Sequence, residues 1–149
     1  MFHVRPATPD DHAFLVAANL GLARETEATE LDESTLAAGV AAALADPGRG
    51  TYFIAEDARG PAGSLLVTRE WSDWRNGWIW WIQSVYVPPE RRRQGVYRRL
   101  HGDVIARARA DAQVRLVRLY VDKDNERARA TYLALGMELS RYDMMVDCL

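Results

Sequence analysis

A strand–helix–strand unit in the second half of the chain constrains the fold most strongly. Residues 78–87 are almost entirely aromatic or aliphatic and end at two prolines, which predicts a strand. Residues 95–112 predict a helix and residues 114–121 a second strand. The apolar residues of the helix recur at every fourth position: Val96, Leu100, Val104 and Ala108. Because such units connect parallel strands through a right-handed crossover, we expect one parallel strand pair here.

The remaining segments add antiparallel strands and further helices. Residues 51–55 and 63–68 each have the pattern of a strand, and a turn that contains Gly60-Pro61 separates them, which predicts a hairpin. Apolar residues at helical spacing predict a first helix that begins after Thr8 or Asp10 as N-cap, and a second predicted helix begins near Asp32. Three short elements complete the prediction: a strand over 3–5, a helix over 125–135 and a last strand over 140–146. This order predicts a mixed sheet with helices on both faces.

Composition agrees with one folded domain of 149 residues, 48% of them hydrophobic and 27% charged. The sequence has no apolar run of membrane-spanning length and no charged-then-apolar leader, so we expect a cytoplasmic protein without a membrane partner. The net charge of -2 is unevenly distributed. Residues 1–89 hold 6 Lys and Arg against 12 Asp and Glu, whereas residues 90–149 hold 13 against 9. The two halves either face partners of opposite charge or form a mixed solvated surface.

The segment between the predicted strand and helix carries the clearest chemical signal. Three arginines, Arg91 to Arg93, and Gly95 lie directly before the helix. A helix N-terminus offers unpaired N–H groups to an anion, and arginine adds charge-assisted hydrogen bonds. The segment therefore indicates a phosphate site or, alternatively, a plain basic loop. It is neither a P-loop nor a dinucleotide fingerprint, because the glycine and lysine spacings of both are missing.

Two motifs in this half of the chain resemble those of GNAT acetyltransferases. Residues 92–97, Arg-Arg-Gln-Gly-Val-Tyr, resemble the family's Arg/Gln-x-x-Gly-x-Gly/Ala acyl-CoA motif. The second motif, about 30 residues later, consists of Asn125, Ala128, Tyr132 and Leu135-Gly136-Met137. The resemblance implies an α/β (α+β) fold in a single domain over 1–149. It implies a mixed, mostly antiparallel sheet of six to seven strands, with about four helices on both faces.

The resemblance also implies acetyl-CoA as co-substrate and assigns residues to it. The end of the predicted strand, Val85 to Val87, would pair with the pantetheine arm. The loop and first helical turn, Arg92 to Arg98, would wrap the pyrophosphate and are called the cradle below. Asn125 would lie near the cofactor. The cofactor-binding residues implied are Val85, Tyr86, Val87, Arg92, Arg93, Gln94, Gly95, Val96, Tyr97, Arg98 and Asn125. Tyr97 departs from the motif, which has Gly or Ala there, so we expect a shifted cradle or a different contact to the cofactor.

The chemistry of amine acetylation needs a proton for the departing thiolate and a base for the amine. The resemblance implies Tyr132 as general acid, and a tyrosine with a pKa near 10 carries that proton at pH 7. The alternative is a tyrosine packed in the core. No base can be assigned, because residues 78–87 contain no carboxylate. Glu56, Glu70 and Asp73 at neighbouring strand ends are the nearest candidates, with surface charge as the alternative.

We predict that aromatic and acidic residues contact an amine acceptor. Trp71 and Trp74 lie in a segment, 70–77, that we expect to be a polar loop, and Glu70 begins it. Aromatic rings beside carboxylates suit a cationic amine. Glu25 opens an acidic run between the first two helices, a region that usually walls the acceptor site in this family. The alternative is a solvated loop.

Other site classes receive little support from the sequence. His3, His12 and His101 have no metal-ligand spacing, so we expect no metal site. The arginines are flanked by an acidic half and form no basic stripe, so we expect no nucleic-acid partner. Homodimers are common in the family. Two functions follow. The first is an N-acetyltransferase whose acceptor is a primary amine of a small molecule or an exposed protein amine, and this amine attacks acetyl-CoA directly in a ternary complex. The second is a non-catalytic acyl-CoA-binding or regulatory module.

Overall fold

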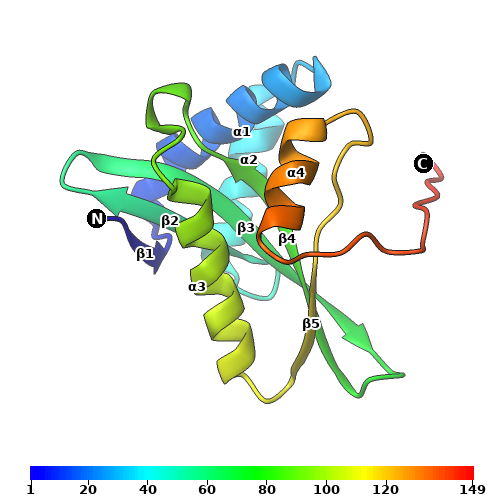
Figure 1. Cartoon of the computed structure of the whole chain (residues 1–149). Coiled ribbons are helices and arrows are strands. Elements are labelled where there is room, and N and C mark those ends of the chain that lie inside the picture. Colours follow the sequence, from blue (N-terminus) through cyan, green and yellow to red (C-terminus); the bar gives the residue numbers. More distant parts are fainter.

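The computed structural model describes residues 1–149 as one mixed sheet with helices on both faces (Figure 1). The strands are β1 (His3–Pro6), β2 (Thr51–Asp57), β3 (Gly60–Ser72), β4 (Gly77–Tyr86) and β5 (Val114–Arg118). The helices are α1 (His12–Glu27), α2 (Glu33–Ala45), α3 (Val96–Ala110) and α4 (Glu126–Ala134). Short 3-10 turns, Pro9–Asp11 and Pro89–Arg91, precede α1 and the loop to α3.

The sheet follows chain order, β1-β2-β3-β4-β5, with antiparallel pairing up to β4 and parallel pairing of β5 with β4. The predicted β-α-β unit and the hairpin are therefore confirmed. The predicted strand number is wrong, because the sheet has five strands and residues 140–146 form none. That segment is rich in residues that favour strands, but in this chain no neighbouring strand forms hydrogen bonds with it.

Two hydrophobic clusters attach the helices to opposite faces of the sheet. On one face, Leu100 and Val104 of α3 pack on Phe53, Leu65 and Ile82 of the strands. On the other, Leu15 and Val16 of α1 and Val40 of α2 pack on Tyr52 and Ile54. Figure 1 shows α3 in front of the sheet and α1 and α2 behind it. None of the helices has the length and apolar character that a membrane span requires.

Candidate functional site

β4 and β5 separate halfway along β4, and this separation defines the site. The parallel pairing ends at Trp81↔Arg118, whereas β4 continues to Tyr86. Near the same point, pairing with β3 moves from Leu66↔Gln83 to Ser64↔Tyr86, so β4 contains one extra residue. Ser84 lies in this bulge with a left-handed φ of 50°, a sparsely populated conformation that bulges near functional sites often hold. The end of β4 therefore leaves one backbone edge without a strand partner.

A cavity of about 830 Å³ opens at this separation. Its walls come from α1, the end of β4, the loop before α3, the first turn of α3, the loop after β5, and α4. The cavity brings together most of the predicted residues: Glu25, Val85, Tyr86, Val87, Arg92, Arg93, Gly95, Val96, Tyr97, Arg98, Asn125 and Tyr132. Gln94 does not line it, because its side chain instead contacts Arg59 (3.1 Å) and the carbonyl of Glu90 (3.0 Å).

The N-terminus of α3 has the geometry of an anion site. Gly95 is its N-cap with a φ of 80°, and no side chain caps the helix. Arg93, two residues earlier, also has a positive φ of 61°. Successive N–H groups in such a turn form a nest, and the first N–H groups of the helix have no intrahelical partner. A pyrophosphate fits this combination of backbone donors and positive charge.

The arginines beside the nest fall into two groups. Arg91 is buried and forms an ion pair with Asp57 (2.6 Å), and this contact holds the pKa of Asp57 to about 2. Arg92 donates from Nε to the carbonyl of Val87 (2.9 Å) and pairs with Glu25. Arg93 and Arg98 are exposed on the cavity wall and pair with no carboxylate. The first two arginines therefore fix the loop, and the second two keep their charge available for an anion.

Glu25 is placed differently from its predicted position in the connection between helices. It belongs to the last turn of α1 and lines the cavity from there. Its carboxylate accepts hydrogen bonds from the Tyr86 hydroxyl (2.9 Å) and from Arg92. Burial opposes ionisation of Glu25, but the hydrogen bonds from Arg92 and Tyr86 outweigh it and hold its pKa below the usual range. The cavity thus carries a fixed negative charge on its α1 side.

Tyr132 and Tyr97 form an aromatic pair on the α3–α4 side. Their ring centroids lie 5.5 Å apart at an interplanar angle of 68°, an edge-to-face arrangement. Burial raises the pKa of both phenols, so each is protonated at neutral pH. The Tyr97 hydroxyl is buried without a hydrogen-bond partner, and the centroid of its ring lies 5.9 Å from that of His101. Tyr97 therefore packs between the two helices and supports Tyr132.

Asn125 explains the second motif in structural terms. Its side-chain Oδ1 accepts from the backbone N–H of Ala128 (3.0 Å) and caps α4. Gly136 follows the helix with a φ of 88°, a conformation that glycine adopts without strain. Between these two signals the helix directs Tyr132 into the cavity.

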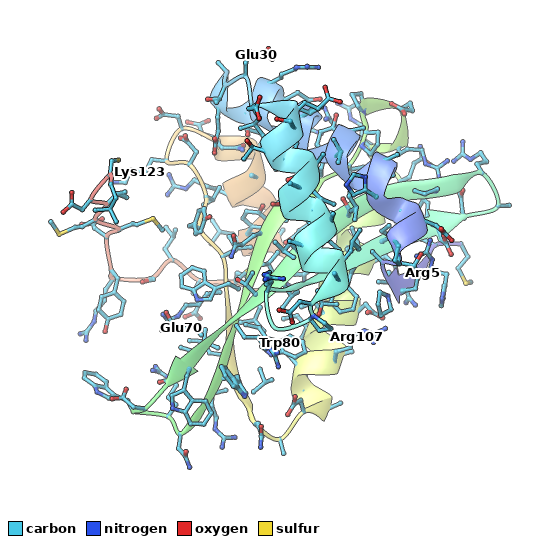
Figure 2. All side chains as sticks on the ribbon, turned by 180° about the vertical axis from the view of Figure 1, so that it is seen from behind. Arg5, Glu30, Glu70, Trp80, Arg107 and Lys123 are labelled. Carbon is cyan, nitrogen blue, oxygen red and sulfur yellow. The ribbon has the colours of Figure 1, made fainter.

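The predicted acceptor residues other than Glu25 do not line the cavity. The expected loop over 70–77 is wrong, because β3 continues to Ser72 and only residues 73–76 separate the strands. Trp71 packs edge-on against Trp78 (5.0 Å), while Trp74 at the tip is 86% exposed. Glu70, visible on the hairpin in Figure 2, faces Arg118 at 3.6 Å.

Several cavity residues were not found from the sequence. Arg127 and Thr131 lie on the face of α4 that carries Tyr132, and Leu22 and Thr26 flank Glu25 on α1. Helical spacing from the predicted residues would have indicated both groups. The carboxylates that line the cavity are Glu25, Asp122 and Asp124. Of the three candidate bases, Glu56 is bound by Arg5 (2.9 Å), and Glu70 and Asp73 lie at the hairpin. No group of three His, Cys, Asp or Glu is placed to hold a metal ion.

Comparisons with solved structures show how widely this architecture occurs. A protein described as a possible acetyltransferase from Clostridium difficile 630 is 38% identical; the alignment covers 100% of this chain and 98% of that chain, with a TM-score of 0.94. A protein from Clostridium acetobutylicum described as a predicted acetyltransferase with acetyl-CoA is 18% identical, with 99% and 96% covered and a TM-score of 0.78. A transcriptional regulator from Bacillus halodurans C-125 is 23% identical, with 99% and 100% covered and a TM-score of 0.81. The last two similarities show the fold alone.

Comparison with protein families gives a more specific result. No curated protein matches the chain significantly. The model of the acetyltransferase (GNAT) family matches residues 17–137, a range that contains the larger part of α1, the loop and first turn of α3, and α4. This match supports acetyl transfer as the general activity. Because it covers well over half of the sequence, the chain belongs to the GNAT acetyltransferase family, which uses acetyl-CoA as co-substrate.

Proposed function

We propose that this chain is an N-acetyltransferase that moves an acetyl group from acetyl-CoA to a primary amine of a small molecule or an exposed protein amine. One observation carries the proposal. A single cavity joins an anion nest, an unpaired strand edge and a protonated tyrosine to a fixed carboxylate on α1. This is the set of groups that acyl transfer to an amine requires.

On the cofactor side, the nest at Gly95 and the free arginines Arg93 and Arg98 bind the pyrophosphate. The edge of β4 at Val85 and Val87 pairs with the amides of the pantetheine arm, as a further strand would. A backbone N–H at the bulge beside Ser84 polarises the thioester carbonyl, as oxyanion donors do.

On the acceptor side, Glu25 attracts and orients the ammonium form of the substrate. Because Arg92 and Tyr86 lower its pKa, Glu25 acts as a charge partner and the ammonium proton leaves to water. The neutral amine nitrogen then attacks the thioester carbon in a ternary complex. The nitrogen, positively charged after attack, loses a second proton to water as the C–S bond breaks and the amide forms. Tyr132 gives its proton to the departing thiolate and afterwards regains one from solvent.

Two measurements test this function. Calorimetric titration with acetyl-CoA should show binding, and thiol release should rise with at least one member of a panel of polyamines, amino acids, aminoglycosides and peptides. Tyr132→Phe should lower kcat by ~10²–10⁴-fold, the usual contribution of a general acid, with little change in acetyl-CoA affinity. Tyr120→Phe, an exposed tyrosine that does not line the cavity, is the matched control. Acetyl-CoA binding without amine-dependent thiol release would instead favour the non-catalytic module.

The role of Glu25 needs a separate readout. Glu25→Gln should raise KM for the amine while the affinity for acetyl-CoA stays within a few-fold. A large loss of acetyl-CoA affinity, with KM for the amine unchanged, would assign Glu25 to the cradle and not to the acceptor.

A further inference from the structure

The side chain of Tyr86 lies on the opposite face of the sheet from those of its neighbours in β4. Val85 and Val87 pack against the hydrophobic cluster beneath α3. The Tyr86 hydroxyl instead donates to Glu25 of α1 at 2.9 Å. Alternation along a strand explains this difference. Pairing of β4 with the pantetheine arm would use the backbone at this position, so it gives the Tyr86 side chain no role.

Gly21 in the middle of α1 makes room for the Tyr86 ring. A Cβ at Gly21 would lie 2.6 Å from Oη and 2.7 Å from Cζ of Tyr86. Glycine destabilises a helix interior relative to alanine, so its presence there needs a reason. The other two helical glycines, Gly39 and Gly102, have no atom within 4 Å of such a Cβ. At Gly21, by contrast, the missing Cβ lets the phenol ring pack directly on the helix backbone.

The Tyr86 ring and the Glu25 carboxylate are held together with Arg92. One carboxylate oxygen of Glu25 accepts from Tyr86 and the other from Arg92. The Arg92 guanidinium carbon also lies 5.8 Å from the centroid of the Tyr86 ring. Burial raises the pKa of Tyr86 and the hydrogen bond to Glu25 raises it further, so the hydroxyl keeps its proton and donates. Tyr86 therefore orients the carboxylate without adding positive charge beside it.

We propose that the Tyr86 side chain, packed on Gly21, is a positioning residue of the acceptor side that orients Glu25 toward the substrate amine. This inference rests on the proposed function, in which Glu25 binds the ammonium form of the amine. Tyr86 acts through Glu25 and touches none of the bonds that change. The residue then serves both sides of the cavity, with its backbone at the cofactor edge and its side chain at the acceptor wall.

Tyr86→Phe tests the proposal, because it removes the donor and keeps the ring. Spermidine, L-lysine, kanamycin and glycyl-lysine serve as amine probes, and the one that the wild type acetylates fastest is used for all variants. The KM for this amine should rise ~10-fold, since a hydrogen bond to a charged group is lost. In the same assays kcat should stay within two-fold, and so should the acetyl-CoA affinity measured by calorimetry. Tyr120→Phe, an exposed tyrosine outside the cavity, should leave all three unchanged.

A double-mutant cycle with Glu25→Ala shows whether Tyr86 acts through Glu25. When the carboxylate is absent, Tyr86→Phe should raise the KM for the amine by no more than two-fold, because the group that it positions is gone. Full additivity of the two substitutions would mean that Tyr86 acts independently of Glu25, and the proposal would be wrong.

Gly21→Ala tests the packing that places Tyr86, and Gly39→Ala is its matched control. The new methyl group at position 21 should turn the Tyr86 ring away from Glu25 and raise the KM for the amine at least as much as Tyr86→Phe does. Gly39→Ala should behave as the wild type, and circular dichroism checks that both variants fold. If Gly21→Ala does not fold, Tyr86→Phe and the cycle decide.

The outcomes separate this inference from the function on which it rests. Thiol release from none of the four amines by the wild type would overturn the proposed function, and the role of Tyr86 with it. An active wild type whose KM for the amine is unchanged in Tyr86→Phe would overturn the role of Tyr86 alone. A loss of acetyl-CoA affinity in Tyr86→Phe, without a change in that KM, would assign the side chain to the cofactor.

Discussion

Gly63 on β3 lies directly beneath the cofactor cradle, and its replacement by alanine tests how tightly the cradle is built. A Cβ at this buried position would lie 2.8 Å from Cγ1 of Val96, 3.0 Å from the carbonyl oxygen of Tyr86 and 3.2 Å from Cγ2 of Val87. These atoms belong to the first residue of α3 and to the end of β4. The new methyl group would therefore push apart the two elements that form the nest.

The expected change in stability can be worked from two opposing contributions. Overpacking a core position costs ~1–3 kcal/mol. Replacing a strand glycine by alanine recovers ~0.5–1 kcal/mol of backbone entropy. Gly63→Ala should therefore lower the free energy of unfolding by about 1–2 kcal/mol. Because the displaced atoms form the nest, affinity for acetyl-CoA should fall as well.

Gly102→Ala is the matched control and should act in the opposite direction. Gly102 lies in the middle of α3, and a Cβ there meets no atom within 4 Å. Alanine is favoured over glycine inside a helix by ~1 kcal/mol, so this variant should gain about that much stability. It should bind acetyl-CoA as the wild type does.

Urea unfolding followed by circular dichroism measures both variants, and calorimetry measures their acetyl-CoA affinity. The reasoning would be refuted if Gly63→Ala unfolded at the same urea concentration as wild type with unchanged affinity. It would also fail if both substitutions shifted stability in the same direction.

Three further predictions concern protonation, charge and the hairpin tip. Burial lowers the pKa of His101 below its ordinary value of 6.5, so the unfolded chain binds a proton before the folded chain does as the pH falls below that value. Wild type should therefore lose stability in that pH range relative to His101→Phe. Urea midpoints of the two proteins that change in parallel between pH 7.5 and 5.5 would contradict this. Arg93→Ala and Arg98→Ala should weaken acetyl-CoA binding more at low salt than at high salt, whereas Arg109→Ala at the far end of α3 should change nothing in calorimetry. Trp74→Ala should leave KM and kcat within about two-fold, and a larger loss in steady-state assays would return the hairpin tip to the acceptor site.

The parts of the fold set by local pattern could be predicted from the sequence. The i+4 spacing in α3 and the motif from Asn125 to Gly136 each describe an element through its own cap and termination. The end of β3 could not be predicted in this way. Glu70 and Trp71 look like loop residues, yet they pair with Ile79 and Trp78 of β4, and this pairing extends the strand.

The contacts between charged residues far apart in the chain could not be predicted for a related reason, because they depend on how the elements pack. Glu25 was predicted on the acceptor side from its charge and from the family resemblance, and that role stays a prediction. Its contacts with Tyr86 and Arg92, however, span 61 and 67 residues and form only when α1 packs behind β4. The last predicted strand illustrates the same limit, since residues 140–146 have the composition of a strand but no strand of the folded chain pairs with them.

The uneven charge of the chain gains a structural meaning from two ion pairs. Arg91–Asp57 and Arg92–Glu25 each join a basic residue of the cradle to an acidic residue from the first half of the chain. Each pair fixes the loop in place and neutralises one arginine, so two positive charges are removed from the set available to an anion. In the proposed function, phosphate binding therefore falls to the nest, Arg93 and Arg98, and we expect the affinity to depend on backbone geometry more than the number of arginines suggests. Glu25 is held on the α1 side by its contact with Arg92, which offsets part of its negative charge, and its other oxygen accepts from the Tyr86 hydroxyl. In the proposed function, this ion pair therefore lies at the boundary between the side of the cavity that binds the anionic cofactor and the side that binds the cationic amine.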